Sequence, residues 1–291
     1  EVTRLMEAVI RPGDRVCLEG DNQKQADLLS SALLAVDLSK VHDLHMVQSG
    51  VVLPEHLDLF DRGVAKKLDY AYSGPQSARI ARMLFGGKIE LGAIHTYLEL
   101  FARYFIDLTP HVALIAAVSA DRDGNLYTGP NTEDTPTVVE ATAFKDGVVI
   151  AQVNEIVDKV PRVDIPADRV HFIVKSDKSF FVEPLFTRDP AAITEGQILT
   201  AMLAIKGIYA PYGVQRLNHG IGFSTAAIEL LLPTFGEKLG LKGKIASHFA
   251  LNPHPALIPA IEAGWVQQIH SFGSEVGMDD YIRARSDIYF T

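Results

Sequence analysis

Short β-branched runs alternate with segments of helical period along almost the whole chain of 291 residues. A strand-like run at 15–18 is followed at 22–35 by a segment whose apolar residues recur on one helical face. The run at 112–118 is continuously apolar, which is typical of strands buried on both faces of a parallel sheet. This alternation predicts an α/β fold in which a mostly parallel sheet is flanked by helices.

The motif Ala-Pro-Tyr-Gly at 210–213 follows a long predicted helix at 194–209 and interrupts the alternation. A second alternation begins after it, with strands predicted at 215–217, 244–249 and 268–271. We therefore expect one full α/β domain at 1–210 and the start of a second at 211–291. Because the second stretch is short for a complete α/β domain, and the chain begins without Met, we expect a piece of a longer polypeptide.

Composition and charge exclude several classes of function. The chain has 27 Lys and Arg against 36 Asp and Glu, a net charge of −9, whereas nucleic acids and anionic membranes require a basic surface. No apolar run reaches the roughly 18 residues of a membrane span, and no signal peptide is recognisable. The single cysteine, Cys17, excludes an internal disulfide framework and favours a reducing, cytoplasmic setting.

Metal and hydrolase signatures are missing from the sequence. No histidine pair has the HExxH spacing, and His42 and His45 stand three residues apart beside a predicted strand, so we expect no metal site. No GxSxG motif is present, and Cys17 lies within an apolar strand. We therefore discount hydrolase and thiol chemistry.

The run Asn218-His219-Gly220-Ile221-Gly222 joins a predicted strand to a predicted helix. Glycines in such a turn let a ligand approach the backbone, and the N–H groups of the following helix can face an anion or a carbonyl oxygen. The run is neither a P-loop nor the dinucleotide fingerprint, since no Gly-Lys-Ser/Thr and no third glycine follow. Two interpretations stay open, a ligand-binding turn and a plain tight turn.

Three further polar segments accompany predicted strands. Asn22, Gln23 and Lys24 follow the strand at 15–18, where Lys24 would either meet a phosphate or carboxylate or belong to a solvated helical turn. Asn131 lies in a polar cluster that is either the start of a helix or the rim of a site. His248 is either a hydrogen-bonded interior residue or a catalytic one.

Taken together, several segments resemble the coenzyme A transferase family. The run 110–115, continuing through 121–129 to 148–154, is similar to the core of the first domain of those enzymes, and Gly220-Ile221-Gly222 to the opening of their second domain. The similarity is greatest to the α subunits of bacterial malonate decarboxylases, for example at 44–49, 125–135, 217–222, 251–255 and 273–277. It spans essentially all 291 residues, although those subunits are longer.

The resemblance implies a transferase that exchanges acetate for malonate on the thioester of an acyl carrier protein. Companion subunits would then decarboxylate the malonyl thioester and regenerate the acetyl form. The thiol would belong to a coenzyme A-like arm, phosphoribosyl-dephospho-CoA, on the carrier subunit, so that this chain needs no cofactor of its own. The implied partners are the carrier and decarboxylase subunits, with malonate and acetate as small molecules.

The chain departs from the family at one important position. Coenzyme A transferases attack the thioester with a glutamate in a Ser-Glu-Asn-Gly motif, where this chain has Ser247-His248-Phe249-Ala250. The resemblance therefore implies direct attack by malonate through a mixed anhydride, with backbone donors at Gly220 and Gly222. Glu275, in a similar motif 27 residues after His248, stays a second candidate nucleophile.

The expected site follows from these segments. Its catalytic candidates are Gly220, Gly222, His248 and Glu275, and its candidates for binding substrate or the carrier arm are Asn22, Gln23, Lys24, Asn131 and Asn218. Arg103, Lys24 and Arg216 are candidates for malonate by charge alone. Two alternatives stay open: a transferase that uses free coenzyme A or resembles the citrate lyase α subunit, and a binding module without activity.

Overall fold

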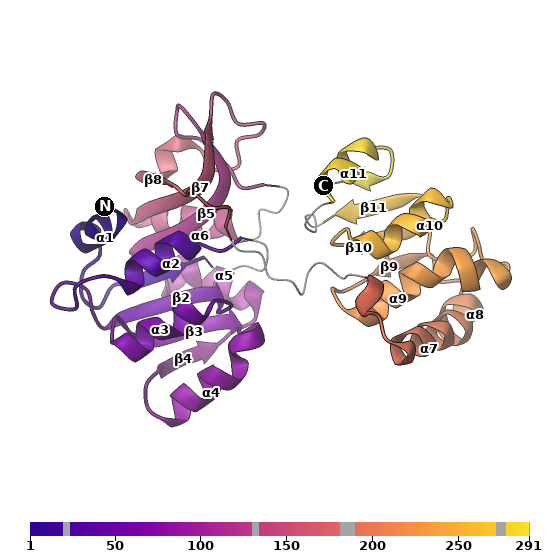
Figure 1. Cartoon of the computed structure of the whole chain (residues 1–291), viewed down its shortest axis with the longest axis horizontal. Helices are drawn as coiled ribbons and strands as arrows, with labels where there is room; N and C mark the ends of the chain where they lie inside the picture. Colours follow the sequence, from indigo (N-terminus) through magenta and orange to yellow (C-terminus); the bar gives the residue numbers. More distant parts are fainter. Residues whose placement is uncertain (20–23, 130–133, 181–189, 272–277, 291) are drawn as a thin grey trace. The chain divides into compact units, whose positions relative to one another are not determined.

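The computed structural model describes residues 1–19, 24–129, 134–180, 190–271 and 278–290. The chain divides into two compact units, Glu1–Glu183 and Pro184–Thr291 (Figure 1). Both units are built from parallel strands and helices, so the α/β class predicted from the sequence is confirmed. No helix in the described part of the chain has the length and apolar character to cross a membrane.

The first unit contains one sheet with the strand order β4-β3-β2-β1-β5-β7-β8, in which all neighbours are parallel. A short strand, β6, pairs antiparallel with β5. The strands are β1 (Arg15–Leu18), β2 (Leu44–Gly50), β3 (Ala65–Tyr72), β4 (Glu90–Ile94), β5 (Val112–Asp121), β6 (Leu126–Tyr127), β7 (Val148–Val157) and β8 (Phe172–Lys175). The helices are α1 (Val2–Val9), α2 (Asp27–Leu34), α3 (Pro54–Arg62), α4 (Ser77–Phe85), α5 (Tyr97–Ile106) and α6 (Thr135–Phe144).

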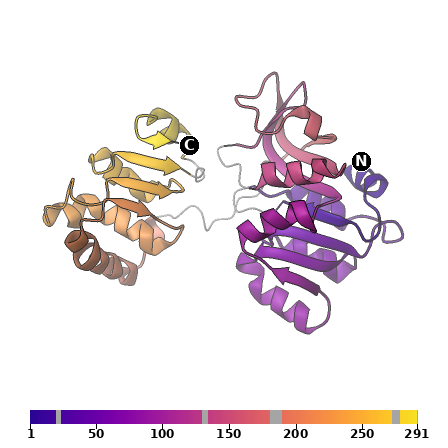
Figure 2. The same cartoon turned by 180° about the vertical axis from the view of Figure 1, so that it is seen from behind.

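Both faces of this sheet are covered. Along β5, Leu114 belongs to a core that also contains Leu29 of α2, and the preceding Ala113 belongs to a second core with Val138 of α6. Figure 1 shows α2 and α3 in front of the sheet, and Figure 2, from behind, shows α5 and α6 on the opposite face. The continuous apolar run of β5 follows from this double burial.

The second unit contains a sheet with the order β12-β11-β10-β9, again with all neighbours parallel. Its strands are β9 (Arg216–Asn218), β10 (His248–Leu251), β11 (Gln268–Ser271) and β12 (Tyr289–Phe290). Its helices are α7 (Glu195–Ala204), α8 (Ala210–Tyr212), α9 (Phe223–Leu231), α10 (Ile258–Glu262) and α11 (Asp279–Ala284). A π-helical segment, η5 (Ile205–Tyr209), joins α7 to α8, and another, η6 (Leu232–Gly236), follows α9.

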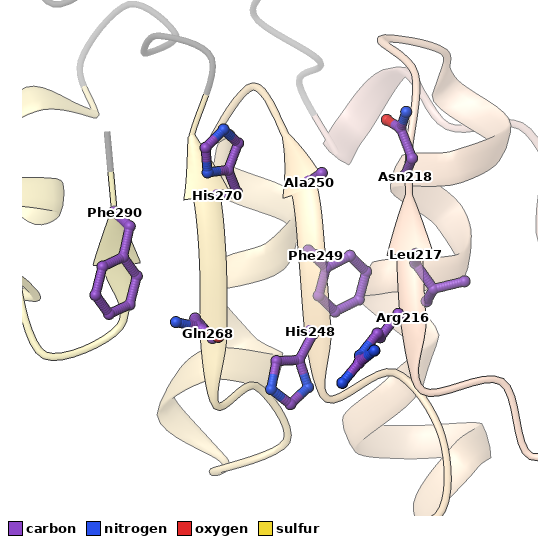
Figure 3. A pocket seen from close by; sticks show the side chains of 9 residues that line it. All are labelled: Arg216, Leu217, Asn218, His248, Phe249, Ala250, Gln268, His270 and Phe290. Carbon is purple, nitrogen blue, oxygen red and sulfur yellow. The ribbon is translucent and has the colours of Figure 1, made fainter.

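One face of the second sheet packs into a core and the other stays open. Phe249, Leu251 and Ile269 point into the core beneath the helices, whereas alternate residues of the same strands are partly or fully exposed. Figure 3 looks on to the open face, with the helices behind the strands. Parallel sheets ordinarily carry helices on both faces, so this sheet differs from the one in the first unit.

The boundary between the units lies before the position expected from the sequence. The expected domains were 1–210 and 211–291, which assign α7 to the first domain. In the structure, Ala201 and Ile205 share one hydrophobic core with Ala227 of α9, so α7 belongs to the second unit. The Pro-Gly signal at 210–213 marks the end of a helix inside this unit, and Gly213 caps it in a left-handed conformation with φ 56°.

β10 also begins later than expected. The prediction was a strand at 244–249, but the chain takes positive φ values at Gly243 (75°) and Ala246 (54°) and enters the sheet only at His248. A residue with positive φ cannot continue an extended strand. His248 is consequently the first residue of β10, which matters for its place in the site.

Candidate functional site

A turn at the carboxyl end of β9 is the part of the second unit best arranged to meet a ligand. β9 ends at Asn218, the chain turns through Gly220, and α9 begins at Phe223 with Gly222 as its N-cap. In open parallel sheets, ligands bind beyond the carboxyl ends of the strands. Three of the residues expected in the site, Asn218, Gly220 and Gly222, are therefore close together along one strand-to-helix turn.

The backbone conformation does not require glycine at position 220 or at position 222. Gly222 has φ −84° and ψ 152°, a conformation open to any residue, and Gly220 has no positive φ. A Cβ atom added at either position would meet nothing within 4 Å. Conformation and packing among the described residues therefore both tolerate a side chain at these positions, and a ligand-binding role for the two glycines stays a prediction.

Backbone donors and one hydroxyl shape this turn. The first N–H groups of α9, a helix of nine residues, have no side-chain cap at Gly222. Such groups attract an anion or a carbonyl oxygen. On the other side, Thr225 Oγ1 lies 2.8 Å from the carbonyl oxygen of Gly220 and 2.7 Å from that of Gly222. The threonine hydroxyl thus ties the carbonyl groups of the turn to the first turn of the helix.

A buried polar network lies directly behind the turn, and the sequence analysis did not predict it. His219 Nδ1 lies 2.6 Å from Glu229 Oε1 of α9, and its Nε2 lies 3.0 Å from the Tyr209 hydroxyl. His254, which follows β10, forms an ion pair through Nε2 with Glu229 Oε2. Glu229 and His254 have no exposed surface, and His219 is 5% exposed.

The histidines determine the ionisation of Glu229. Burial alone would raise the pKa of this carboxyl group. The charge of His254 and the hydrogen bonds from His219 and His254 outweigh burial and lower the pKa to about 2. Glu229 is therefore a carboxylate at neutral pH, and each of its oxygens accepts a hydrogen bond from an imidazole N–H group.

His248 is not at this turn. It lies in register with Arg216, four residues before Gly220, which places it about 13 Å from the turn at about 3.3 Å per residue. Its ring is half-buried, and Nδ1 lies 2.9 Å from Ser247 Oγ. The structure therefore separates His248 from the predicted catalytic glycines, Gly220 and Gly222. The catalytic role of His248 stays a prediction.

A hollow of about 590 Å³ covers the open face of the sheet instead (Figure 3). His248 and Arg216 lie near its amino-terminal edge, and Asn218 and His270 near the carboxyl ends of the strands. No acidic side chain lines the hollow, which is bordered by Arg216, Leu217, Asn218, His248, Phe249, Ala250, Gln268, His270 and Phe290. Asn218 is thus shared between the hollow and the turn.

Lys24, in the first unit, is engaged inside the protein. Its ammonium group is 3.1 Å from Glu19 Oε1 and 2.6 Å from the Thr135 hydroxyl, and the side chain is 2% exposed. Glu19, directly after β1, also accepts a hydrogen bond of 2.5 Å from the backbone N–H of Ala116. The interpretation of Lys24 as part of a solvated helical turn is therefore wrong, because its side chain is buried. A binding role for Lys24 stays a prediction.

The remaining candidates have different outcomes. Asn22, Gln23, Asn131 and Glu275 lie outside the described residues. Of the residues considered for malonate by charge, Arg103 forms a two-pronged pair with Asp107, with distances of 3.0 and 2.6 Å. Arg216 lines the hollow and has no acidic partner among the described residues.

The described residues include no group of three or more His, Cys, Asp or Glu side chains arranged to hold a metal ion. Cys17 is buried in β1, and burial raises the pKa of its thiol well above the ordinary value. A thiolate is consequently disfavoured at this position.

Comparisons with known proteins bear on the identity of this arrangement. The family model described as "Malonate decarboxylase, alpha subunit, transporter" matches residues 1–291. The chain belongs to the malonate decarboxylase α-subunit family. Within this family it is 67% identical, over 286 residues, to a protein of Malonomonas rubra named acetyl-S-ACP:malonate ACP transferase. That match covers 98% of the chain and 52% of the relative, so the chain spans about half the length of the curated relative.

Solved structures agree with the family. The chain is 61% identical, with a TM-score of 0.94, to a chain in the crystal structure of a Pseudomonas malonate decarboxylase hetero-tetramer in complex with malonate. It is covered completely and spans 54% of that chain. The fold also matches that of an acyl-CoA transferase of Escherichia coli O157:H7, with a TM-score of 0.59 and 15% sequence identity. The match covers 84% of this chain and 59% of the transferase chain, and at this identity it shows the fold alone. The resemblance to coenzyme A transferases is thereby confirmed for the fold.

Proposed function

We propose that this chain is part of a transferase that exchanges acetate for malonate on the thioester of an acyl carrier protein. One observation carries the proposal, the 67% identity over 286 residues to a relative named for that activity. The glycine turn supports it, since uncapped helix N–H groups and open space suit the carbonyl oxygen of a thioester. We further propose that malonate is the incoming acid, as the ligand of the Pseudomonas relative suggests.

The exchange proceeds in two balanced steps. A carboxylate oxygen of malonate attacks the acetyl carbonyl carbon, and the C–S bond breaks. The products of this step are an acetyl-malonyl anhydride and the free thiolate of the carrier. The thiolate then attacks the malonyl carbonyl carbon, the C–O bond of the anhydride breaks, and acetate leaves. Each attack puts negative charge on a carbonyl oxygen, and we assign the stabilisation of that charge to the backbone N–H groups at Gly222 and the start of α9.

The composition of β10 supports direct attack by malonate. Its four residues, His248–Leu251, include no carboxylate that could form a covalent intermediate. Glu229 is not an alternative nucleophile, because both of its oxygens are paired and it has no exposed surface. His248 receives no chemical step, since its register places it about 13 Å from the turn at about 3.3 Å per residue. Glu275 is the competing nucleophile that an experiment must exclude.

The carrier supplies the thiol in this proposal. Its phosphoribosyl-dephospho-CoA arm is a substrate group that reaches the turn, so the chain needs no cofactor of its own. The hetero-tetramer of the Pseudomonas relative supports assembly with companion subunits, to which we assign the decarboxylation. The net charge of −9 opposes the approach of malonate and of a phosphorylated arm, so binding depends on local donors and cations.

An exchange assay tests the proposed function. The intact protein, mixed with acetyl-carrier thioester and malonate, should release acetate and form the malonyl thioester. Parallel reactions with citrate and with free acetyl-CoA separate the alternative transferases. Exchange with malonate on the carrier thioester supports the proposal, whereas exchange only with citrate, only with free acetyl-CoA, or with none of these substrates contradicts it.

A further inference from the structure

The mechanism above makes no use of Glu229, although this buried carboxylate is linked to the glycine turn. We propose that Glu229 is a positioning residue that holds the Gly220–Gly222 turn in place through His219 and couples it, through His254, to the segment after β10. The inference rests on the proposed function for its kinetic consequence, but its structural claim can be tested without turnover.

Glu229 is linked directly to the turn through His219. His219 is the residue before Gly220, and its ring is fixed at both nitrogens, by Glu229 at 2.6 Å and by Tyr209 at 3.0 Å. A ring held at both ends leaves the adjoining peptide little freedom to rotate. The position of the donors at the turn therefore depends on where α9 places Glu229.

The other oxygen of the carboxylate links Glu229 to the segment after β10. His254 contacts the other oxygen of Glu229, and its backbone follows β10 in the run Asn252-Pro253-His254-Pro255. One carboxylate thus joins the segments that follow two neighbouring parallel strands, β9 and β10. These are the strand ends between which open α/β sheets place their ligands.

The link between the two histidines requires an ionised acceptor. Both imidazole rings donate a hydrogen bond to the same carboxyl group, each to a different oxygen, whereas an amide has only one oxygen and a neutral carboxyl has one oxygen protonated. The titratable groups that act on Glu229 are His219, His254, Tyr209 and Tyr289. The pKa values of both tyrosines are raised, chiefly by burial, so the tyrosines are neutral at pH 7.

The test compares Glu229→Gln with Leu232→Ala in the intact protein. Leu232 is a fully buried residue of the same core, and its backbone N–H donates to the carbonyl oxygen of Glu229. The alanine variant keeps this backbone hydrogen bond and removes only apolar side-chain atoms, so it lowers stability and leaves the side-chain hydrogen bonds of the network in place. At temperatures equally far below each melting temperature, we expect Glu229→Gln to lower kcat about 10-fold or more while KM for the carrier thioester changes less than about 2-fold. Leu232→Ala should leave both constants close to wild type.

A second readout is independent of turnover. In protein labelled with ¹⁵N-glycine, Glu229→Gln should shift the amide signals of Gly220 and Gly222, and Leu232→Ala should not. Glu237→Gln removes an exposed glutamate near the end of the same helical segment and serves as the control for charge, with no expected change in either readout.

The outcomes separate the two claims. A wild-type protein that performs no exchange contradicts the proposed function, and the glycine signals then still decide the positioning claim. Unchanged Gly220 and Gly222 signals in Glu229→Gln, or an equal loss of kcat in Leu232→Ala, would overturn the positioning role. If Glu229→Gln does not fold, Tyr209→Phe provides a second test, because it removes the hydroxyl group that contacts His219 Nε2. This variant should shift the amide signals of Gly220 and Gly222, and unshifted signals would also overturn the positioning role.

Discussion

Replacing Gly222 by valine should lower the rate of acyl exchange by about 100-fold or more, the loss typical of a disturbed oxyanion site. The valine side chain would occupy the open space above the turn, where the thioester carbonyl has to approach the helix N–H groups. Stability should fall by no more than about 1 kcal/mol, the cost of a poorer N-cap residue, because φ −84° and ψ 152° suit a β-branched residue and the new Cβ meets nothing within 4 Å. The measurements are exchange kinetics and denaturant unfolding.

A graded series makes this expectation sharper. The exchange rate of Gly222→Ala should lie between those of the wild type and Gly222→Val, since the alanine side chain fills less of the space above the turn than valine does. Gly207→Ala is the matched control, at another glycine without positive φ whose added Cβ would meet nothing within 4 Å. Full activity in a folded Gly222→Val protein would remove the turn from the site.

Replacing Lys24 by methionine should destabilise the first unit by about 3–5 kcal/mol, the cost of removing one partner from a buried ion pair. The Glu19 carboxylate, with 0% of its side chain exposed, would lose the ammonium 3.1 Å away. Methionine has a similar length, so lost packing contributes little by comparison. Denaturant unfolding of the first unit measures the difference.

Two controls separate this structural role from a role in binding. Lys88→Met removes an exposed lysine and should change the free energy of unfolding by less than about 0.5 kcal/mol. A double variant, Lys24→Met with Glu19→Gln, should recover part of the lost stability, because it removes the buried negative charge together with the positive one. A Lys24→Met protein with unchanged stability and a raised KM for malonate would instead assign Lys24 to substrate binding.

Much of the fold was predictable from local patterns. The bounds predicted for β1 and β11 coincide with the structure, since each is a short run between clear turn signals. The boundary between the units was not predictable in this way. The Pro-Gly signal at 210–213 ends a helix, but whether that helix packs on the first or the second core is decided by tertiary contacts of Ala201 and Ile205.

The candidate site was partly predictable. The glycine turn follows from a short motif, and the structure places it at a strand end as expected. The start of β10 at His248 was not predictable, because the left-handed residue Ala246 delays the strand, and neither composition nor periodicity signals such a conformation in alanine. The network around Glu229 joins residues 219, 229 and 254, and a single acid within the apolar run Ile228–Leu232 was its only sequence signal.

The central claim, direct attack by malonate, predicts the fate of a single oxygen atom. Malonate labelled with ¹⁸O in its carboxylates would be reacted with unlabelled acetyl-carrier thioester and excess intact protein in a single turnover, and the released acetate analysed by mass spectrometry. In direct attack the malonate oxygen that bonds to the acetyl carbon leaves with it, so the acetate should carry one ¹⁸O. Unlabelled acetate formed together with an equal amount of malonyl thioester, which excludes hydrolysis by water, would show that a protein carboxylate such as Glu275 supplied the oxygen, and would contradict the account.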